Sequence, residues 1–184
     1  MKHFAILACL AIAACSPAPE ASNVAAVENT ATPAVAPKLV TGPEVQTPAK
    51  RYADATAAYN SFARASATLG KTKASSAAVK KYAEMVYKEQ LQFGMDFKLA
   101  AGGVPGLLPN TTLTPEQQEN IETLQQASGT AFDQAFVSQQ VAAHAKAMPV
   151  QQAYGTSGDE PDLKAFADRY SRWVQRHLRL GKEL

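Results

Sequence analysis

The sequence predicts an all-α protein, an up-and-down bundle of four long helices within residues 48–184. Two observations lead to this prediction. From Pro48 onward, apolar residues recur at the three- and four-residue spacing of amphipathic helices, and no segment shows the strict alternation of a half-buried strand. The segments between the helical patterns are short, which favours helices that fold back on their predecessors.

The first helix is expected from about Ala49 to Leu69, and Gly70 is expected to end it. Ser75 or Ser76 then caps a second helix that stops at Gly102-Gly103. The stripes expected to be buried are Tyr52, Ala55, Tyr59, Phe62, Ala63 and Ser66 in the first helix, and Val79, Tyr82, Ala83, Val86, Phe93 and Phe97 in the second.

A third helix has a strong start signal in Thr114-Pro115-Glu116-Gln117, which combines a threonine cap, a proline at the first helical position and a glutamine placed for a capping box. It is expected to be interrupted or kinked at Ser128-Gly129 and to continue to about Met148, where Pro149 breaks or bends its end. Its expected buried residues are Phe132, Phe136, Val137 and Ala143.

The last helix should begin at Pro161, after a turn from Tyr154 to Glu160. One face is apolar and the opposite flank is basic. A basic flank is usually a solvated face, favoured by the dipole at a helix C-terminus, and the alternative is contact with an anionic surface. The apolar face holds Leu163, Phe166, Ala167, Tyr170, Trp173, Val174 and Leu178; the basic flank holds Arg169, Arg172, Arg176, Arg179 and Lys182.

Polar residues interrupt the apolar stripes of three helices. Glu89 and Gln90 lie between Val86 and Phe93, His177 lies in the stripe of the last helix, and His144 lies at the margin of the stripe before it. Because an unpaired buried charge is costly, Glu89, His144 and His177 should find partners. They form either a satisfied polar cluster or a site for a divalent transition metal such as zinc or iron. The absence of His-x-x-x-His and Glu-x-x-His spacings favours the polar cluster.

The N-terminus reads as an export signal. A basic start precedes an apolar run from Phe4 to Ala14 that is too short to span a bilayer. Ile12-Ala13-Ala14-Cys15 resembles the processing box of bacterial lipoproteins, and the resemblance implies that Cys15 becomes a lipidated N-terminus at the periplasmic face of a membrane. The residue after Cys15 is Ser16 and not the aspartate that signals inner-membrane retention, so the outer membrane is expected. The alternative is a secreted protein with an unmodified cysteine.

The chain is expected to have three parts. Residues 1–14 are the signal peptide, and residues 15–47 hold Cys15 and an Ala/Pro-rich linker that buries too little apolar surface to offset its ordering entropy. Residues 48–184 are long enough for one ordinary core. No cysteine follows Cys15, so a cysteine nucleophile and cysteine-ligated metal sites are excluded from this domain.

Other functions are disfavoured by composition and motifs. The net charge is only +2 with both signs interspersed, so nucleic acid is not an expected partner. The sequence has neither a Gly-x-Ser-x-Gly elbow nor a glycine-rich phosphate loop. An enzyme is therefore the less favoured interpretation.

Four pieces of the sequence, in this order and spacing, carry a family resemblance. They are Val79 to Val86, Leu108-Pro109 with Leu113 to Gln118, Gly129 to Asp133 leading to Val141 to His144, and Leu163 to Ala167 with His177-Leu178. Together they resemble the bacterial envelope family called domain of unknown function 4142. The resemblance implies a ferritin-like bundle. Members tend to carry a glutamate where this chain has Ala63 and an Asp-His pair where it has Lys88-Glu89, while His144 and His177 match the family pattern.

These observations predict a lipid-anchored periplasmic protein of the outer membrane with a non-enzymatic role, structural, stress-related or partner-binding. The membrane, reached through the lipid, is one expected partner, and an envelope protein or polymer is another. No cofactor is favoured. The alternative is a metal-binding bundle that uses Glu89, His144 and His177.

Overall fold

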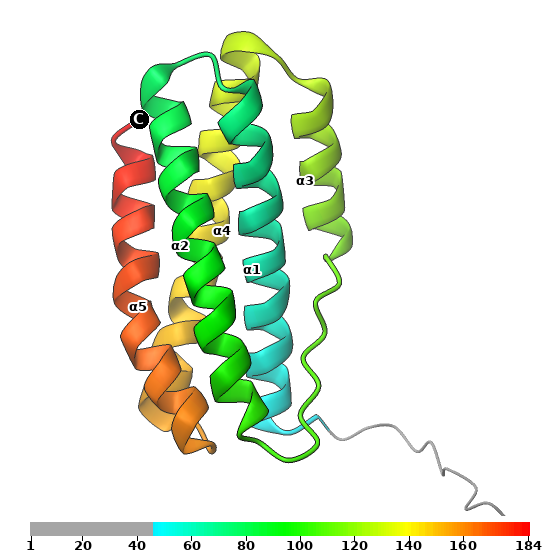
Figure 1. Ribbon diagram of the computed structural model, residues 1–184, viewed down its shortest axis with the longest axis vertical. Helices are drawn as coiled ribbons and strands as arrows, with labels where there is room; N and C mark the ends of the chain where they lie inside the picture. Colours follow the sequence, from blue (N-terminus) through cyan, green and yellow to red (C-terminus); the bar gives the residue numbers. More distant parts are fainter. Residues whose placement is uncertain (1–45) are drawn as a thin grey trace, which may run out of the picture. The chain divides into compact units, whose positions relative to one another are not determined.

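The computed structural model describes residues 46–184, which confirm the prediction of a helical bundle (Figure 1). The predicted signal peptide, Cys15 and nearly all of the predicted linker lie outside the described residues. Within residues 46–184, every helix is too short or too polar to cross a membrane. The helices are α1 (Pro48–Lys73), α2 (Ala77–Gly102), α3 (Pro115–Gln126), α4 (Gly129–Ser157) and α5 (Pro161–Lys182).

The four long helices do not simply alternate in direction. Figure 1 shows α1 and α5 running one way and α2 and α4 running the other. Residues 103–128, which include the short α3, cross from one end of the bundle to the other before α4 begins. Short connections were expected throughout, and this one is long. One long crossover is the connection that ferritin-like bundles use, and here it leaves each long helix antiparallel to its packed neighbours.

Gly70 does not end the first helix, contrary to the prediction. It lies inside α1 and is buried, and the helix continues to Lys73. A Cβ at Gly70 would lie 2.7 Å from the Ala83 Cβ, which is closer than two carbon atoms approach. Glycine therefore allows α1 and α2 to lie close together here. In the sequence, such a glycine looks the same as one that ends a helix.

The start of α3 confirms the predicted capping box. The backbone N–H of Gln117 donates to the Thr114 hydroxyl oxygen, and the backbone N–H of Thr114 donates to the Gln117 side chain, at 3.2 and 2.9 Å. The predicted break at Ser128-Gly129 separates two helices, and Gly129 has a φ of 57° that suits glycine.

Pro149 neither breaks nor ends α4, and the turn predicted from Tyr154 is helical up to Ser157. Pro149 is exposed, so water can satisfy the carbonyl that its missing N–H leaves free. Beyond it, the ring of Tyr154 stacks on Tyr52 at a centroid distance of 3.9 Å. This tertiary contact holds the last turns of α4 in place despite the proline.

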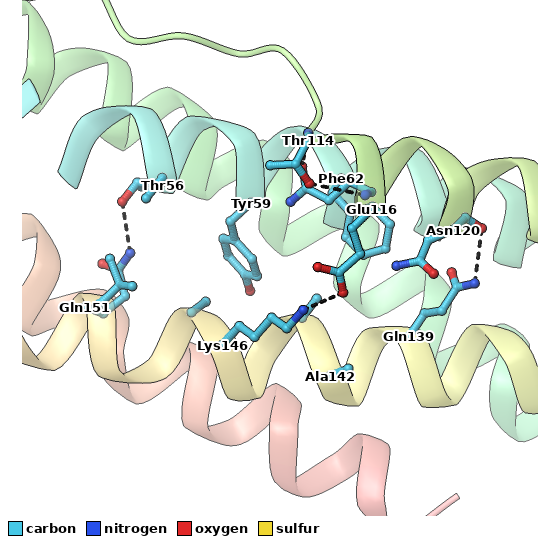
Figure 2. Close-up of a pocket in the computed structure, with 15 residues that line it drawn as sticks. Thr56, Tyr59, Phe62, Thr114, Glu116, Asn120, Gln139, Ala142, Lys146 and Gln151 are labelled. Atoms are coloured by element: carbon cyan, nitrogen blue, oxygen red, sulfur yellow. Dashed lines mark hydrogen bonds and ion pairs between the residues drawn. The ribbon is translucent and has the colours of Figure 1, made fainter. Parts of the chain in front are cut away.

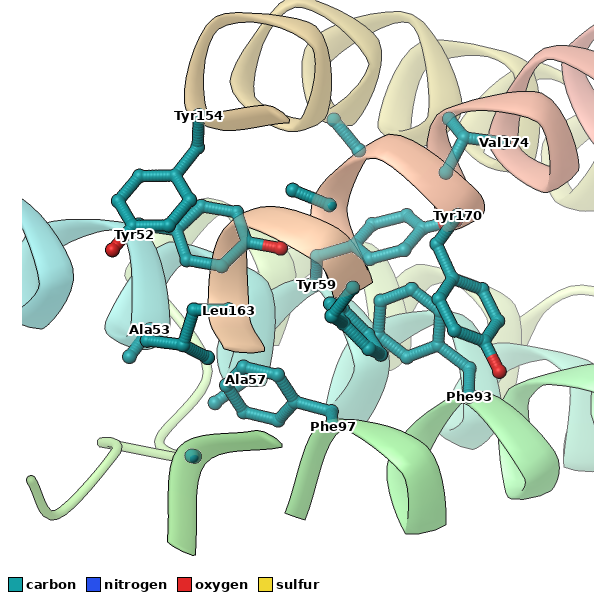
Figure 3. Packing of buried hydrophobic residues seen from close by; sticks show 14 of the residues in the cluster. Tyr52, Ala53, Ala57, Tyr59, Phe93, Phe97, Tyr154, Leu163, Tyr170 and Val174 are labelled. Carbon is teal, nitrogen blue, oxygen red and sulfur yellow. The ribbon is translucent and has the colours of Figure 1, made fainter. Parts of the chain in front are cut away.

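The core consists of two apolar clusters, one toward each end of the bundle. The first joins the start of α1 and α5 to the ends of α2 and α4. Within it, the Phe93 ring meets Phe166 and Tyr170 edge to face, and Figure 3 shows Phe93 beside Tyr170. The second joins the other ends of these helices around Phe132 and Phe136, together with Leu124, the one residue that α3 buries. Buried polar side chains lie between the two clusters, and we call them the polar layer. They include Gln90, Gln140, His144 and His177.

Candidate functional site

Glu89, His144 and His177 come together as a hydrogen-bonded chain across three helices. His144 of α4 has Nε2 3.0 Å from Nδ1 of His177 on α5. His177 Nε2 is 2.7 Å from a carboxylate oxygen of Glu89 on α2. At the other end, His144 Nδ1 is 2.6 Å from the backbone carbonyl oxygen of Gln140. Arg176 completes the chain by donating to the same oxygen of Glu89.

The hydrogen-bond partners of the two histidines determine which ring nitrogens carry protons. The Gln140 carbonyl can only accept, so His144 must carry its proton on Nδ1 and accept at Nε2. His177 must then donate from Nδ1 to His144. A proton is also needed between His177 Nε2 and Glu89, and an ionised Glu89 cannot supply it. With Glu89 ionised, His177 satisfies both contacts by donating from Nδ1 to His144 and from Nε2 to the Glu89 carboxylate.

The local electrostatics support this arrangement. Burial opposes charge on Glu89, but hydrogen bonds from His177 and Arg176 and their positive charges hold the pKa of Glu89 below its usual range. Burial, reinforced by the charge of His177, lowers the pKa of His144 to about 3, against the weaker opposing effect of the hydrogen bond to the Gln140 carbonyl. His144 is therefore neutral at physiological pH, as the hydrogen bonds require.

The row of hydrogen bonds is closed to solvent at its inner end, at His144, and reaches solvent only at its outer end, at Glu89. His144 and His177 have exposed fractions of 0% and 1%, so an external substrate has no access to either ring. His144 was expected at the margin of its stripe and instead is fully buried. The Glu89 side chain is 19% exposed and the Arg176 side chain 42%. Solvent therefore meets the chain at Glu89 and Arg176.

The geometry is that of a linear chain and not of a ligand set around one point. His177 faces His144 with one nitrogen and Glu89 with the other, so one ion cannot bind the three side chains through these atoms. Within residues 46–184, no group of three His, Cys, Asp or Glu side chains is placed to hold a metal ion.

Sequence reasoning singled out Gln90 but missed the other amides around this row of hydrogen bonds. Gln90 Nε2 donates to the Tyr59 hydroxyl at 3.0 Å, and Asn60 donates to Gln90 Oε1 at 2.8 Å, which ties α1 to α2. Gln140 and Gln151 of α4 are both buried and bond to α1. Gln140 and His144 continue the four-residue spacing of Phe132 and Phe136, and Gln151 follows two turns after His144. This polar continuation of an apolar face was the signal that could have revealed the two glutamines.

A pocket of about 220 Å³ lies beside the polar layer, between α1, α4 and the first turns of α3 (Figure 2). Small side chains leave this space, and Ala55, predicted to be buried, is exposed here. An ion pair between Lys146 and Glu116 spans the pocket, with both side chains about two-thirds exposed (66% and 65%). Tyr59 lines the pocket and also contacts His144 edge to face, at 5.7 Å between ring centroids, while neither histidine lines it.

The basic flank of α5 is exposed along its length, as predicted. Acidic neighbours offset part of its charge. Arg176 binds Glu89, Arg179 donates to Glu183 at 2.9 Å, and Arg172 lies 4.0 Å from Asp168. Arg169 lies over the Tyr170 ring. Contact between this flank and an anionic surface stays a prediction, and so does lipidation of Cys15.

Comparison with known families identifies the chain. The model of the family described as Domain of unknown function (DUF4142) matches residues 34–184. The chain belongs to this family. Searches of curated proteins and of solved structures returned no significant match. Within this DUF4142 member, Ala63 is fully buried in α1, so the position where the family resemblance implied a glutamate contributes no carboxylate to the polar layer.

Proposed function

We propose that this DUF4142 protein is a lipid-anchored protein of the bacterial outer membrane that faces the periplasm and acts without catalysis. The observation that carries the anchor is the tetrapeptide Ile12-Ala13-Ala14-Cys15, which places Cys15 directly after an apolar run of signal-peptide length. The role of the bundle is structural or partner-binding, with an envelope protein or polymer as the partner.

The closed polar layer supports a non-enzymatic role. The imidazoles, which are the groups best suited to acid-base chemistry near neutral pH, are buried and bonded to each other and to Glu89. A catalytic base must reach the proton that it removes from its substrate. The cluster instead ties α2, α4 and α5 together, a structural use of buried polar groups.

Processing of the chain in bacteria tests the anchor. The chain expressed with its signal should lose residues 1–14 and carry acyl groups on Cys15, as mass spectrometry of the N-terminal peptide would show. An inhibitor of the lipoprotein signal peptidase should cause the precursor to accumulate. Cys15→Ala should leave the protein outside the detergent phase. A mature wild-type chain with an unmodified Cys15 would refute the proposal.

Membrane fractionation tests the compartment with a matched variant. The wild-type chain should co-sediment with the outer membrane. Ser16→Asp should move it to the inner membrane, because it introduces the retention signal that the sequence lacks. If both proteins sediment with the inner membrane, the proposed location is wrong.

A further inference from the structure

Large apolar side chains are exposed toward one end of the bundle, from the middle of α2 to the segment that follows it. Five such side chains are exposed within residues 46–184, and four of them lie on the second half of α2 or in the segment that follows it. The fifth, Leu184, follows α5. The four are Leu91, Met95, Leu99 and Leu108, with exposed fractions of 38%, 56%, 78% and 79%, and we call them the apolar end patch.

The patch follows from the helical repeat. Leu91, Met95 and Leu99 are four residues apart, so they form one ridge along α2. Phe93 and Phe97 point to the core instead, where they are 1% and 6% exposed. The ridge is therefore additional to the apolar surface that the core uses, and its exposure increases toward the end of the helix. Lys88 and Lys98 lie on α2 within the same stretch and are exposed.

The start of α1 also lies at this end of the bundle. α1 begins at Pro48, and Ala49 and Tyr52 pack in the same cluster as Phe97 and Ala101 from the end of α2. Leu108 belongs to the same end, because the backbone N–H of Asn110 donates to Asp54 of α1 at 2.8 Å. Figure 1 shows the start of α1 and the end of α2 together at the lower end of the bundle.

We propose that the apolar end patch contacts the lipid surface to which the chain is tethered. The inference rests on the proposed function, because a lipid on Cys15 with a linker of about thirty residues would hold the patch at an effective concentration on the order of millimolar near the bilayer. A weak apolar contact then suffices to orient the bundle. Lysines beside exposed leucines suit the interface, since their ammonium groups can remain among the headgroups.

The test uses the full mature chain, purified from bacterial membranes and reconstituted into vesicles of phosphatidylethanolamine and phosphatidylglycerol. Partition into the detergent phase first establishes whether the lipid is present, so failure of the anchor is recognised separately. An environment-sensitive fluorophore is then attached at Leu99→Cys. The matched control is Gln126→Cys, an exposed position on the last turn of α3, toward the other end of the bundle.

We expect the emission at position 99 to shift to the blue on reconstitution and to be quenched by lipids brominated on their acyl chains, with neither change at position 126. Adding Leu91→Glu and Leu108→Glu should abolish the shift while the chain stays membrane-bound through its lipid. Equal signals at positions 99 and 126 in an anchored chain would overturn the proposal. A shift that depends on protein concentration and occurs without vesicles would also overturn it, because a second copy would then cover the patch.

Discussion

The rings of His144 and His177 meet nitrogen to nitrogen at 3.0 Å, and only one of these two nitrogens can carry the proton between them. The Gln140 carbonyl decides which one, because it holds the proton of His144 on Nδ1. A backbone carbonyl on α4 therefore sets the direction of the hydrogen bond from His177 on α5, which leaves His177 Nε2 to face Glu89 on α2. Three helices share one ordered set of protons.

Nitrogen NMR of the imidazole rings should show this order directly. At neutral pH we expect His144 to be the neutral tautomer with its proton on Nδ1, and its Nε2 to accept a hydrogen bond from His177 Nδ1. The sequence has three histidines, and the third, His3, lies in the predicted signal peptide, so assignment in the mature chain is simple. A His144 ring that carries its proton on Nε2 would contradict the arrangement.

Stability should fall as the pH falls below the ordinary histidine range. The folded state resists protonation of His144 until about pH 3, whereas the unfolded state takes up this proton near pH 6.5. Between these two pH values the unfolded state binds more protons than the folded state. His144 should therefore lower the free energy of unfolding by about 1.4 kcal/mol for each unit that the pH falls. Urea unfolding should give a loss of about 2 kcal/mol between about pH 7 and pH 5. His144→Gln should lose most of this dependence; an unchanged dependence would rule out His144 as its source.

Removal of Glu89 should destabilise the fold more than removal of Arg176. Glu89→Ala leaves the buried His177 without its acceptor, and we expect a loss of about 2 kcal/mol in the free energy of unfolding. Arg176→Ala removes a partner whose side chain is 42% exposed, and the loss should stay below about 1 kcal/mol. Chemical denaturation at neutral pH compares the two. The reverse order would mean that Arg176 carries the stabilisation.

Gly70→Ala should destabilise the bundle, although alanine is the better helix former. Its Cβ would lie 2.7 Å from the Ala83 Cβ, so α1 and α2 must separate, at a cost of about 1–3 kcal/mol. Gly102→Ala is the control, because a Cβ there meets no atom within 4 Å. Thermal unfolding should place only the Gly70 variant well below the wild type. Equal melting temperatures for the wild type and Gly70→Ala would show that the helices adjust freely.

Metal analysis should find no stoichiometric transition metal. The side chains of Glu89, His144 and His177 are arranged in a row, so zinc or iron would have to disrupt their hydrogen bonds in order to bind. Elemental analysis of protein purified without a histidine tag measures this. One metal per chain, lost in the His144→Ala, His177→Ala double variant, would instead support the metal-binding alternative.

Helix boundaries were predictable where the signal is local, and they failed where tertiary packing decides. The capping box at Thr114 uses only neighbouring residues, so its pattern is sufficient to place the start of α3. Gly70 and Pro149 carry the local signature of a helix end, yet both lie inside helices. The close approach of Ala83 explains the first, and the stacking of Tyr154 on Tyr52 supports the second.

The candidate site was predictable in membership but not in geometry. The helical repeat places Glu89 and His177 near the core, and it shows that three helices contribute polar groups. It does not show that His177 lies between the other two, or that Tyr59 bonds to Gln90 and not to Glu89. These facts depend on helix rotation and on which helices are neighbours, and the long crossover sets the latter. The pocket beside α3 depends on the same crossover.

The start of α1 and the end of α5 lie at opposite ends of the bundle (Figure 1). The 26 residues of α1 alone extend about 39 Å. A chain attached to a membrane before Pro48 would therefore present Leu184 about one helix length away from its point of departure, and the basic side chains from Arg172 to Lys182 would lie toward that distant end. In mechanical terms, the bundle is a rigid spacer that keeps Pro48 and Leu184 about one helix length apart.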